Sequence, residues 1–194
     1  MKIYLASASP RRRELLRQVG IEFEVLLPAV SEHRQTSEPP HAYVQRLAVE
    51  KARFAARLLA ERKLPQYPVL GADTAVVIDG DILGKPRGPG DGVDMLRRLS
   101  GRTHEVLTAL CVIHRDAEHY ALSASNVTFR ALTDADIFRY WDTGEPLDKA
   151  GAYAIQGYAA GFVSRLEGSY SGVMGLPLYE LRQILEKIGL NESE

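Results

Sequence analysis

The chain has 194 residues, of which 45% are hydrophobic and 25% are charged, and its formal net charge at pH 7 is -1. This is ordinary usage for a globular domain with a sizeable core. It lacks the basic excess that is typical of proteins that bind nucleic acid or anionic membranes. We therefore expect one domain over residues 1–194, either as a single large unit or as two small lobes that share a cleft, without a separable linker. It is expected to bind neither nucleic acid nor membrane.

Cysteine usage and hydropathy exclude several further classes of protein. The only cysteine, Cys111, excludes an intramolecular disulfide and a zinc site made of several cysteines. It lies in the apolar run Val106–Ile113, which predicts a buried thiol that packs as a small hydrophobe. No apolar run approaches the roughly 18 residues of a membrane span, and the stretch before Ser7 is too short for the apolar core of a signal peptide. The expected location is the cytoplasm.

A predicted strand over Ile3–Ala6 leads into a turn of small residues and then into a helix. Ser9 and the proline after it are typical of an N-cap and a first helical position. Arg11 and Arg12 occupy the first turn, where the helix dipole disfavours cations. A strand, a turn with Ser7 and Ser9, a helix N-terminus and adjacent arginines together favour an anion site, most naturally for phosphate. The alternative is a solvated basic turn.

Two charged residues in the next part of the chain can be interpreted in two ways. A strand is predicted over Ile21–Val30, and Glu32 in the polar loop after it is either solvated or part of a site. A long helix over His41–Lys63 carries an apolar stripe, and Lys51 falls inside that stripe. Lysine can extend its ammonium to solvent from such a place. The alternative is an ammonium aimed into a cleft, where it could meet a phosphate or Asp73.

The stretch Val69–Pro86 is predicted to form a buried hairpin. Its Val- and Ile-rich first half is typical of a buried strand, and the Asp-Gly pair in its middle is a two-residue turn signal. Asp73 interrupts the apolar run, and a carboxylate there is costly unless it is paired, hydrogen-bonded or bound to a cation. Counting outward from the turn places Thr74 level with Lys85. The hairpin therefore indicates a functional site or an unusually polar place in the core.

The remaining elements alternate between helices and strands. We predict a helix over Val93–Leu99, strands over Glu105–Ile113 and Ala121–Arg130, a helix over Thr133–Tyr140, a loop over Gly168–Gly175 and a helix over Pro177–Ile188. Strands interleaved with helices and hairpins indicate an α/β or α+β fold with a mixed sheet.

The segment Leu147–Val163 combines three glycines with no clean period, which suggests backbone that approaches a ligand closely. Its polar side chains include Lys149 and Gln156. An amide such as that of Gln156 can donate and accept at once, which suits the recognition of a base edge. The alternative is an exposed turn glutamine.

Together these residues favour phosphate chemistry. The cations suit a polyphosphate, and the two carboxylates suit a divalent metal, a water nucleophile or both; they are Arg11, Arg12, Lys51 and Lys85, and Glu32 and Asp73. The chain contains no GxxxxGK[ST] loop, no GxGxxG after a strand and no GxSxG elbow. The residues alone therefore predict a hydrolase of a phosphate ester or anhydride.

Several long motifs follow one another in a fixed order. They are SASPRR at Ser7–Arg12, EHRQ from Glu32, YVQRLAVEKA at Tyr43–Ala52, GADTAVVIDGDILGKP at Gly71–Pro86, LSGRTHEVLTA at Leu99–Ala109, TFRALTDADIFRYWDTGEPLDKAGAYAIQG at Thr128–Gly157, and GLPL at Gly175–Leu178. In this order they resemble the Maf family of nucleoside triphosphate pyrophosphatases over nearly the whole chain.

The resemblance implies hydrolysis between the α- and β-phosphates, which gives a nucleoside monophosphate and pyrophosphate, with Mg²⁺ or Mn²⁺ as the divalent metal. It also implies a curved mixed β-sheet flanked by helices, similar to inosine triphosphate pyrophosphatase, with the site in a cleft between two lobes. A homodimer and an influence on septum formation are compatible with the family. A nucleotide-binding regulator without turnover is the alternative from another functional class.

The resemblance also implies roles for single residues. Asp73 matches the catalytic base, accompanied by Lys51 and Lys85, and Glu32 and Asp73 are the expected metal contacts. The expected substrate contacts are Ser7, Ser9, Arg11, Arg12, Thr74, Lys149 and Gln156. Arg11, Thr74 and Gln156 fall at positions that separate the branches of the family and resemble the dTTP/UTP branch. A 7-methyl-GTP or purine-directed pyrophosphatase is the nearest alternative.

Overall fold

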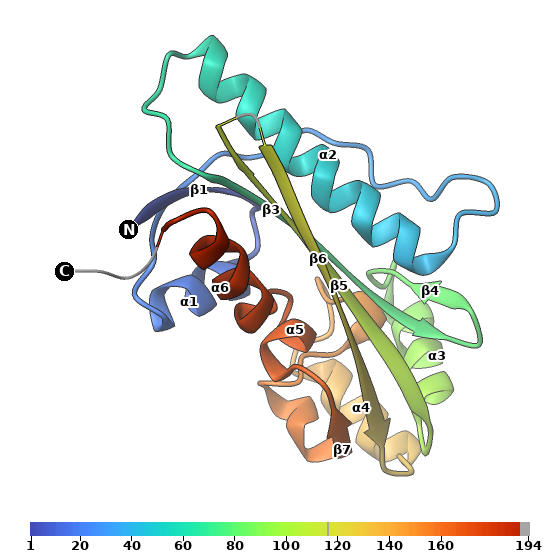
Figure 1. Ribbon diagram of the computed structural model, residues 1–194. Coiled ribbons are helices and arrows are strands. Elements are labelled where there is room, and N and C mark those ends of the chain that lie inside the picture. The colour runs from blue at the N-terminus through green and yellow to red at the C-terminus, as the bar shows by residue number, and fades with distance from the viewer. Residues whose placement is uncertain (116, 191–194) are drawn as a thin grey trace.

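The computed structural model describes residues 1–115 and 117–190, and its regular elements alternate along the chain (Figure 1). The strands are β1 (Lys2–Ala6), β2 (Glu22–Val25), β3 (Val69–Ile78), β4 (Asp81–Leu83), β5 (Thr103–His114), β6 (Ala117–Phe129) and β7 (Val163–Glu167). The helices are α1 (Pro10–Gln18), α2 (Pro40–Glu61), α3 (Pro89–Leu99), α4 (Asp134–Asp142), α5 (Tyr170–Met174) and α6 (Leu178–Lys187), with short 3₁₀ turns η1 (Ala150–Ala152) and η2 (Tyr158–Phe162).

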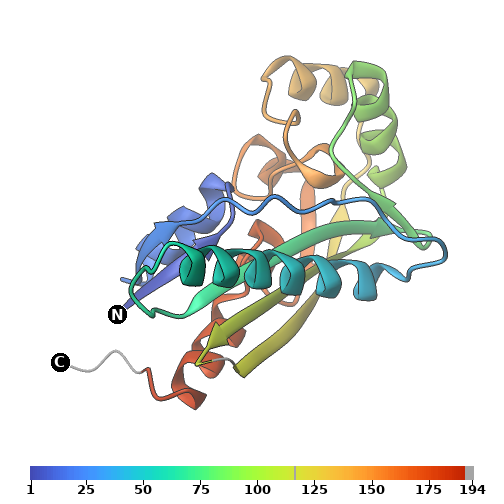
Figure 2. The same ribbon diagram turned by 90° about the horizontal axis from the view of Figure 1, so that it is seen from above.

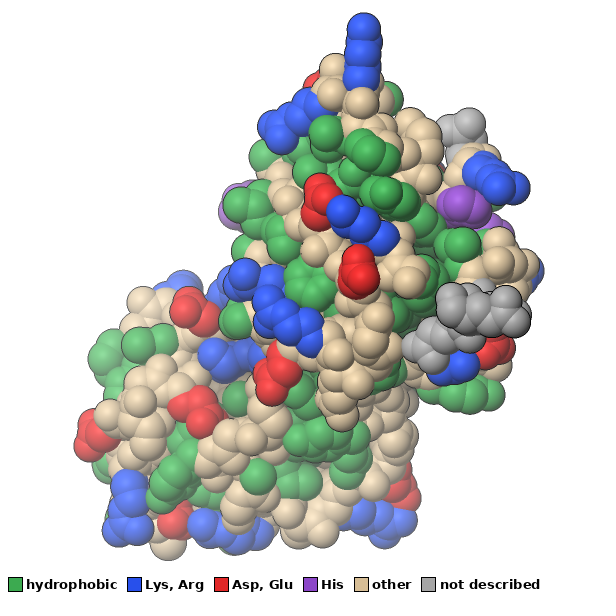
Figure 3. Space-filling view, turned by 90° about the vertical axis from the view of Figure 1, so that its left-hand side faces the viewer, with side chains coloured by type: hydrophobic (Ala, Val, Ile, Leu, Met, Phe, Trp, Pro, Cys, Tyr) green, Lys and Arg blue, Asp and Glu red, His purple; other side chains and the backbone are tan. Residues whose placement is uncertain are grey.

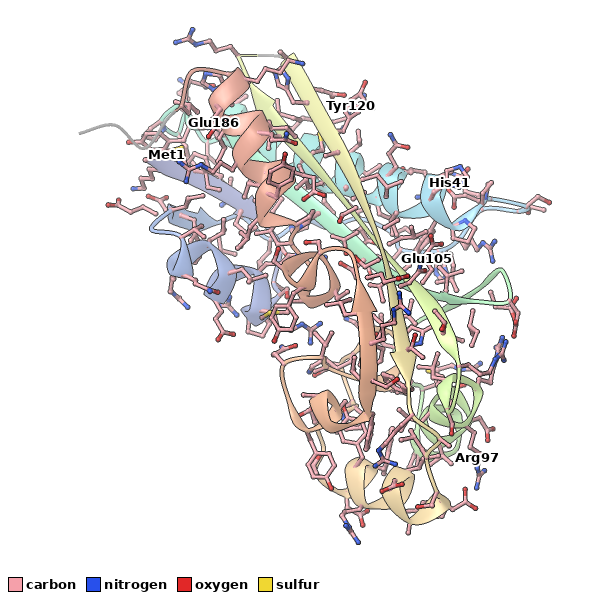
Figure 4. All side chains as sticks on the ribbon, turned by 60° about the horizontal axis from the view of Figure 1, so that its bottom comes forward. Met1, His41, Arg97, Glu105, Tyr120 and Glu186 are labelled. Atoms are coloured by element: carbon pink, nitrogen blue, oxygen red, sulfur yellow. The ribbon has the colours of Figure 1, made fainter. Side chains whose placement is uncertain are left out.

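Within the described residues, seven strands form one mixed sheet in the order β2-β1-β3-β5-β6-β7, with β4 attached to β3. Strands β2, β1 and β3 run parallel, whereas β3, β5, β6 and β7 are antiparallel neighbours. The long strands β5 and β6 extend from the end of the molecule that carries Tyr120 to the end where α3 carries Arg97 (Figure 4). The expected α/β fold with a mixed sheet flanked by helices is confirmed.

Strand β3 changes its neighbour on one edge part-way along its length. It pairs with β1 through Gly71 and with β4 from Val76, so among the described residues no strand covers that edge over residues 72–75. Asp73 and Thr74 lie in this gap. A ligand can approach the sheet where a strand loses its neighbour, as happens at the switch points of open α/β sheets.

Helices cover both faces of the sheet (Figures 1 and 2). On one face α2 packs against β3 and β5, with the small residues Ala48 and Ala52 against Ala75 and Leu107. The other face forms the larger core, to which α1, α3, α4 and α6 contribute. Alternate residues of a strand point to opposite faces, so Asp73 is on the α2 side and Thr74 is on the side of the larger core. No helix in the described ranges combines the length and the apolar character needed to cross a membrane.

The hairpin turn forms as expected, but its second strand is shorter than predicted. Asp79 and Gly80 both have positive φ, as the favoured two-residue hairpin turn requires, and Ile78 pairs with Asp81. Pairing ends at Leu83 because the chain turns away at Gly84, whose carbonyl accepts a hydrogen bond from Gly151 N. The expectation that Thr74 lies level with Lys85 is therefore wrong. Thr74 pairs with Thr108 of β5 instead.

Two other segments differ from the sequence expectation. The predicted strand over Ile21–Val30 shortens to β2, because its partner β1 ends at Ala6 and the last pair of the two strands is Leu5 with Val25. The predicted loop over Gly168–Gly175 contains helix α5, which Ser169 caps and which Gly175 ends with a φ of 116°. A five-residue helix offers too little periodicity to be recognised in a sequence.

Candidate active site

A cavity of about 820 Å³ opens beside the uncovered edge of β3. Its walls come from the β1–α1 turn, the loop before α2, strands β3 and β4, the segment 148–156 and the region of α5. It brings together all the residues that the sequence singled out, namely Ser7, Ser9, Arg11, Arg12, Glu32, Lys51, Asp73, Thr74, Lys85, Lys149 and Gln156. A second cavity of about 240 Å³, lined mostly by apolar side chains of α6 and its neighbours, contains none of them.

Asp73 and Lys51 form a buried ion pair at the centre of this cavity. Lys51 Nζ lies 2.6 Å from Asp73 Oδ1 and 2.6 Å from Glu32 Oε1, so one ammonium joins two carboxylates. Lys51 and Asp73 are nearly inaccessible, whereas the Glu32 side chain is 54% exposed. Of the two interpretations of Lys51, the structure supports the ammonium aimed into a cleft.

The two carboxylates have different proton affinities. Burial raises the pKa of Asp73 above its ordinary value, against the opposing attraction of Lys51 and Arg12. Burial acts in the same direction on Glu32, but the hydrogen bond and charge of Lys51 outweigh it and hold the pKa of Glu32 below its ordinary value. A carboxylate with a raised pKa is better matched to general base catalysis near neutral pH than an ordinary one.

Arg12 is held rigidly at the start of α1 by three neighbours. Its Nε donates to the Gly175 carbonyl at 2.7 Å, Nη1 donates to Ser7 Oγ at 3.0 Å, and Nη2 donates to Thr74 Oγ1 at 3.1 Å. The Ser9 side chain caps the helix by accepting from Arg12 N. Burial lowers the pKa of Arg12 from its very high ordinary value, yet a guanidinium remains charged at neutral pH. The turn therefore presents a fixed cation and a helix N-terminus, as an anion site requires.

Three further cations at the cavity have no fixed partner. Arg11, Lys85 and Lys149 make no side-chain hydrogen bond or ion pair with any described residue, and burial lowers the pKa of Arg11 and of Lys149. The cavity wall carries five cationic side chains against three carboxylates, although the whole chain has a net charge of -1. The space-filling view shows lysine and arginine side chains beside acidic ones over the face that it presents, instead of a continuous basic surface (Figure 3). The cavity therefore concentrates positive charge locally and suits a small polyanion.

Part of the cavity wall is apolar. Tyr153, Ile155 and Met174 line it together with Val76, and Gln156 is exposed at its rim. An apolar wall with a few polar groups is typical of small-molecule sites.

Comparison with known proteins agrees with this geometry. The family model described as "Maf: Maf-like protein" matches residues 2–188. The chain belongs to the Maf family. It is similar to proteins named "dTTP/UTP pyrophosphatase" from Alkalilimnicola ehrlichii (55% identity, covering 97% of this chain and 94% of that protein) and Cupriavidus pinatubonensis (54% identity, 97% of each). A third, from Dechloromonas aromatica, is 49% identical and covers 97% of this chain and 98% of that protein.

A solved structure shares the fold of this Maf chain. The Ham1 protein of Staphylococcus aureus superposes with a TM-score of 0.54 at 13% identity, covering 97% of this chain and 100% of that protein. At this identity the likeness concerns the fold alone, and it agrees with the fold class expected from the sequence.

Sequence reasoning on this Maf chain missed the residues that hold Arg12 in place. Thr108 Oγ1 donates to the Gly172 carbonyl at 2.8 Å and lies 2.9 Å from Thr74 Oγ1, and the Gly175 carbonyl accepts from Arg12. Gly172 and Gly175 belong to α5 and its end, a segment with no element in the sequence prediction. The only sequence signal for the positive φ of Gly175 was the residue type itself, a glycine that precedes Leu-Pro.

The loop that carries Glu32 is anchored by a charge cluster on α2. Arg46 Nε lies 2.6 Å from Glu38 Oε1, and Arg46 Nη2 donates to Glu38 Oε2 and to the His33 carbonyl. Tyr43 Oη donates to the Glu32 carbonyl at 2.9 Å. The side chain of Glu38 is only 8% exposed. These contacts fix the loop against α2 and so hold Glu32 beside Lys51.

We expect Glu38→Gln to destabilise the protein by about 1–3 kcal/mol at pH 7, because it removes hydrogen bonds between charged groups. The hydrogen bond from Arg46 lowers the pKa of Glu38 from 4.5 to about 2. The unfolded chain therefore takes up a proton at higher pH than the folded one, and the stabilisation is lost as the pH falls from about 4.5 toward about 2. Urea unfolding midpoints measured from pH 7 down to pH 3 test this.

Glu50→Gln is the matched control, since Glu50 also pairs with Arg46, at 3.3 Å, but its side chain is 39% exposed. It is expected to change stability by about 0.5 kcal/mol or less. Equal losses in the two variants, or a Glu38→Gln loss that stays constant down to pH 3, would contradict the anchoring role.

Proposed function

We propose that this chain hydrolyses dTTP and UTP to the nucleoside monophosphate and pyrophosphate. The observation that carries the proposal is a buried carboxylate, Asp73, on an uncovered strand edge and surrounded by cations in one cavity. Its relatives at 49–55% identity over 97% of the chain are named dTTP/UTP pyrophosphatases. The geometry supports an anhydride hydrolase, and the relatives' names support the choice of nucleotides.

The proposed roles follow from the positions of the charges. Arg12 and Lys85, which has no ionic partner among the described residues, neutralise phosphate oxygens, and the serines of the β1–α1 turn donate hydrogen bonds to them. Asp73 accepts a proton from a water molecule whose oxygen forms a bond to the α-phosphorus. The bond from that phosphorus to the bridging oxygen breaks, and pyrophosphate leaves with the electron pair. Lys51, held between Asp73 and Glu32, favours the ionised form of both carboxylates.

The residues at the cavity also fit a divalent cation, Mg²⁺ or Mn²⁺. Asp73 and Glu32 each contact Lys51 Nζ through one oxygen, Oδ1 and Oε1, which leaves the second oxygen of each carboxylate for a cation. Mg²⁺ is commonly held by one or two carboxylates together with substrate phosphates. Among the described residues no group of three His, Cys, Asp or Glu side chains could hold a metal alone, so the substrate would complete the site. When bound, the cation would neutralise phosphate charge as a Lewis acid.

Base recognition is assigned to the rim that carries Gln156. Gln156 offers a donor and an acceptor there, and Arg11 and Lys149 add positive charge to the wall of the same cavity. Thr74 contributes through Arg12, because Thr74 Oγ1 accepts a hydrogen bond from Arg12 Nη2. We propose that residues 1–194 act as one unit, because β3 contributes to cores on both faces of the sheet. The nucleotide substrates of the proposed reaction favour a location in the cytoplasm.

The test is pyrophosphate release from UTP, dTTP, CTP, GTP and 7-methyl-GTP, with Mg²⁺ or Mn²⁺ and with EDTA as the metal-free reference. We expect turnover of UTP and dTTP that EDTA abolishes and added metal restores. Preferred turnover of GTP or 7-methyl-GTP would overturn the substrate assignment and keep the reaction. Tight nucleotide binding without turnover under either metal would overturn the hydrolase and favour a regulator.

A further inference from the structure

The segment that carries Gln156 is a tight turn at the rim of the cavity. Gly157 N donates to the Ala154 carbonyl at 3.1 Å, which closes a four-residue turn with Gln156 at its third position. Gln156 is exposed, lines the cavity and makes no hydrogen bond with the described residues. The position of its amide is therefore determined by whatever holds the turn.

Two acceptors, the half-buried Glu145 and the buried Tyr140, hold the turn on either side of Gln156. Glu145 Oε2 accepts from Tyr158 N at 2.9 Å, two residues after Gln156. Tyr140 Oη accepts from Ala154 N at 3.2 Å, two residues before it, and donates to Glu145 Oε1 at 2.7 Å. One carboxylate and one phenol, both outside the cavity lining, thus fix the two ends of the turn.

Packing leaves this arrangement little freedom. A Cβ on Gly157 would lie 2.1 Å from Glu145 Oε2, so the carboxylate sits directly against the backbone of the turn. The Tyr158 ring stacks on the Tyr140 ring with centroids 5.6 Å apart and an interplanar angle of 21°. Burial and the Glu145 carboxylate both raise the pKa of Tyr140, so its hydroxyl keeps the proton that it donates to Glu145.

We propose that Glu145, acting with Tyr140, is the positioning residue for nucleobase recognition in this enzyme. This rests on the proposed function, because it assigns a support to the turn that offers Gln156 to the base. A carboxylate is required because both of its oxygens accept a hydrogen bond here, whereas an amide has one acceptor oxygen and an NH₂ group that can only donate. Glutamine at this position would therefore either lose the hydrogen bond from Tyr158 N or leave the Tyr140 hydroxyl without its acceptor.

Glu145→Gln tests the proposal in kinetics and in binding. We expect KM for UTP and the UTP dissociation constant from calorimetry to rise about tenfold, as for the loss of one or two hydrogen bonds to a base, with kcat within a factor of about two. The inhibition constant of inorganic tripolyphosphate, which has phosphates and no base, should stay unchanged. Tyr140→Phe, which keeps the stacked ring and removes the hydroxyl, should shift the same quantities in the same direction.

Asp142→Asn is the matched control, because Asp142 is an exposed carboxylate on α4 that makes no hydrogen bond or ion pair with the described residues. It should leave every quantity at the wild-type value. Unchanged UTP affinity in both Glu145→Gln and Tyr140→Phe, or an equal weakening of UTP and tripolyphosphate, would overturn the positioning role. If wild type binds UTP without turnover, the proposed function fails while the dissociation constants still decide this proposal. If wild type does not bind UTP at all, both fail.

Discussion

Asp73→Asn is expected to lower kcat for UTP by about 10³-fold, which is the usual contribution of a positioned general base, with a much smaller change in KM. Asparagine has nearly the shape of aspartate but cannot accept the proton of the attacking water. Lys51 keeps Glu32 as an ionic partner in this variant, so the loss of stability should be below the roughly 3–5 kcal/mol of a fully broken buried pair. Steady-state kinetics and thermal unfolding measure the two effects separately.

The pH profile adds an independent test of the same residue. Because burial raises the pKa of Asp73, kcat/KM of the wild type should fall as the pH drops through a value above the ordinary 3.8 of aspartate. Glu32→Gln is the control, since Glu32 contacts the same ammonium but is half exposed, and it should retain this acid limb. Recovery of the wild-type rate in Asp73→Asn by more metal would assign Asp73 to metal binding alone and contradict the base.

The parts of the site that follow from local rules were predictable from the sequence. Ser9 caps α1. Arg11 and Arg12 line the cavity, as their unfavourable charge in the first helical turn suggested. The Asp-Gly turn set the hairpin register for the three pairs that exist. Asp73 was recognisable because a lone carboxylate in an apolar strand needs a cation, and Lys51 in an apolar helical stripe needs an anion. Each of these two charged residues therefore predicted a buried partner of opposite charge.

What could not be predicted depends on contacts between distant segments. The sequence analysis singled out neither Glu38 nor Arg46, and only the folded chain shows that Glu38 is buried against Arg46 and anchors the loop that carries Glu32. Glu145 had no role in the sequence analysis, although its carboxylate accepts a hydrogen bond from Tyr158 N, thirteen residues later in the chain. Such roles arise from tertiary hydrogen bonds that carry no periodic signal, whereas strands, caps and turns do.

Gly71 links the fold to the chemistry, because it sets how closely α2 approaches β3. A Cβ at this position would lie 2.3 Å from Ala48 O and 2.6 Å from Ala52 N, which are both backbone atoms of α2. Gly71 and Asp73 share one face of the strand, and Lys51 is the neighbour of Ala52 on the helix. The close contact of backbone with backbone is therefore what lets the Lys51 ammonium reach Asp73 at 2.6 Å.

Gly71→Ala is accordingly expected to destabilise the protein by about 3 kcal/mol or more, at or beyond the upper end of the usual cost of overpacking a core. In whatever fraction stays folded, α2 must move outward, so kcat should fall with the loosened Lys51–Asp73 pair. Urea unfolding and single-turnover kinetics measure the two losses. Because the obstacle is backbone, adding Ala52→Gly should not restore stability.

Gly90→Ala is the matched control for this substitution. Gly90 lies in α3 with no atom within 4 Å of a new Cβ, and alanine in a helix is better than glycine by about 0.5–1 kcal/mol. It should therefore leave activity unchanged and raise stability slightly. Wild-type stability in Gly71→Ala, or full rescue by Ala52→Gly, would show that α2 does not depend on this contact and that the Lys51–Asp73 pair is positioned by other means.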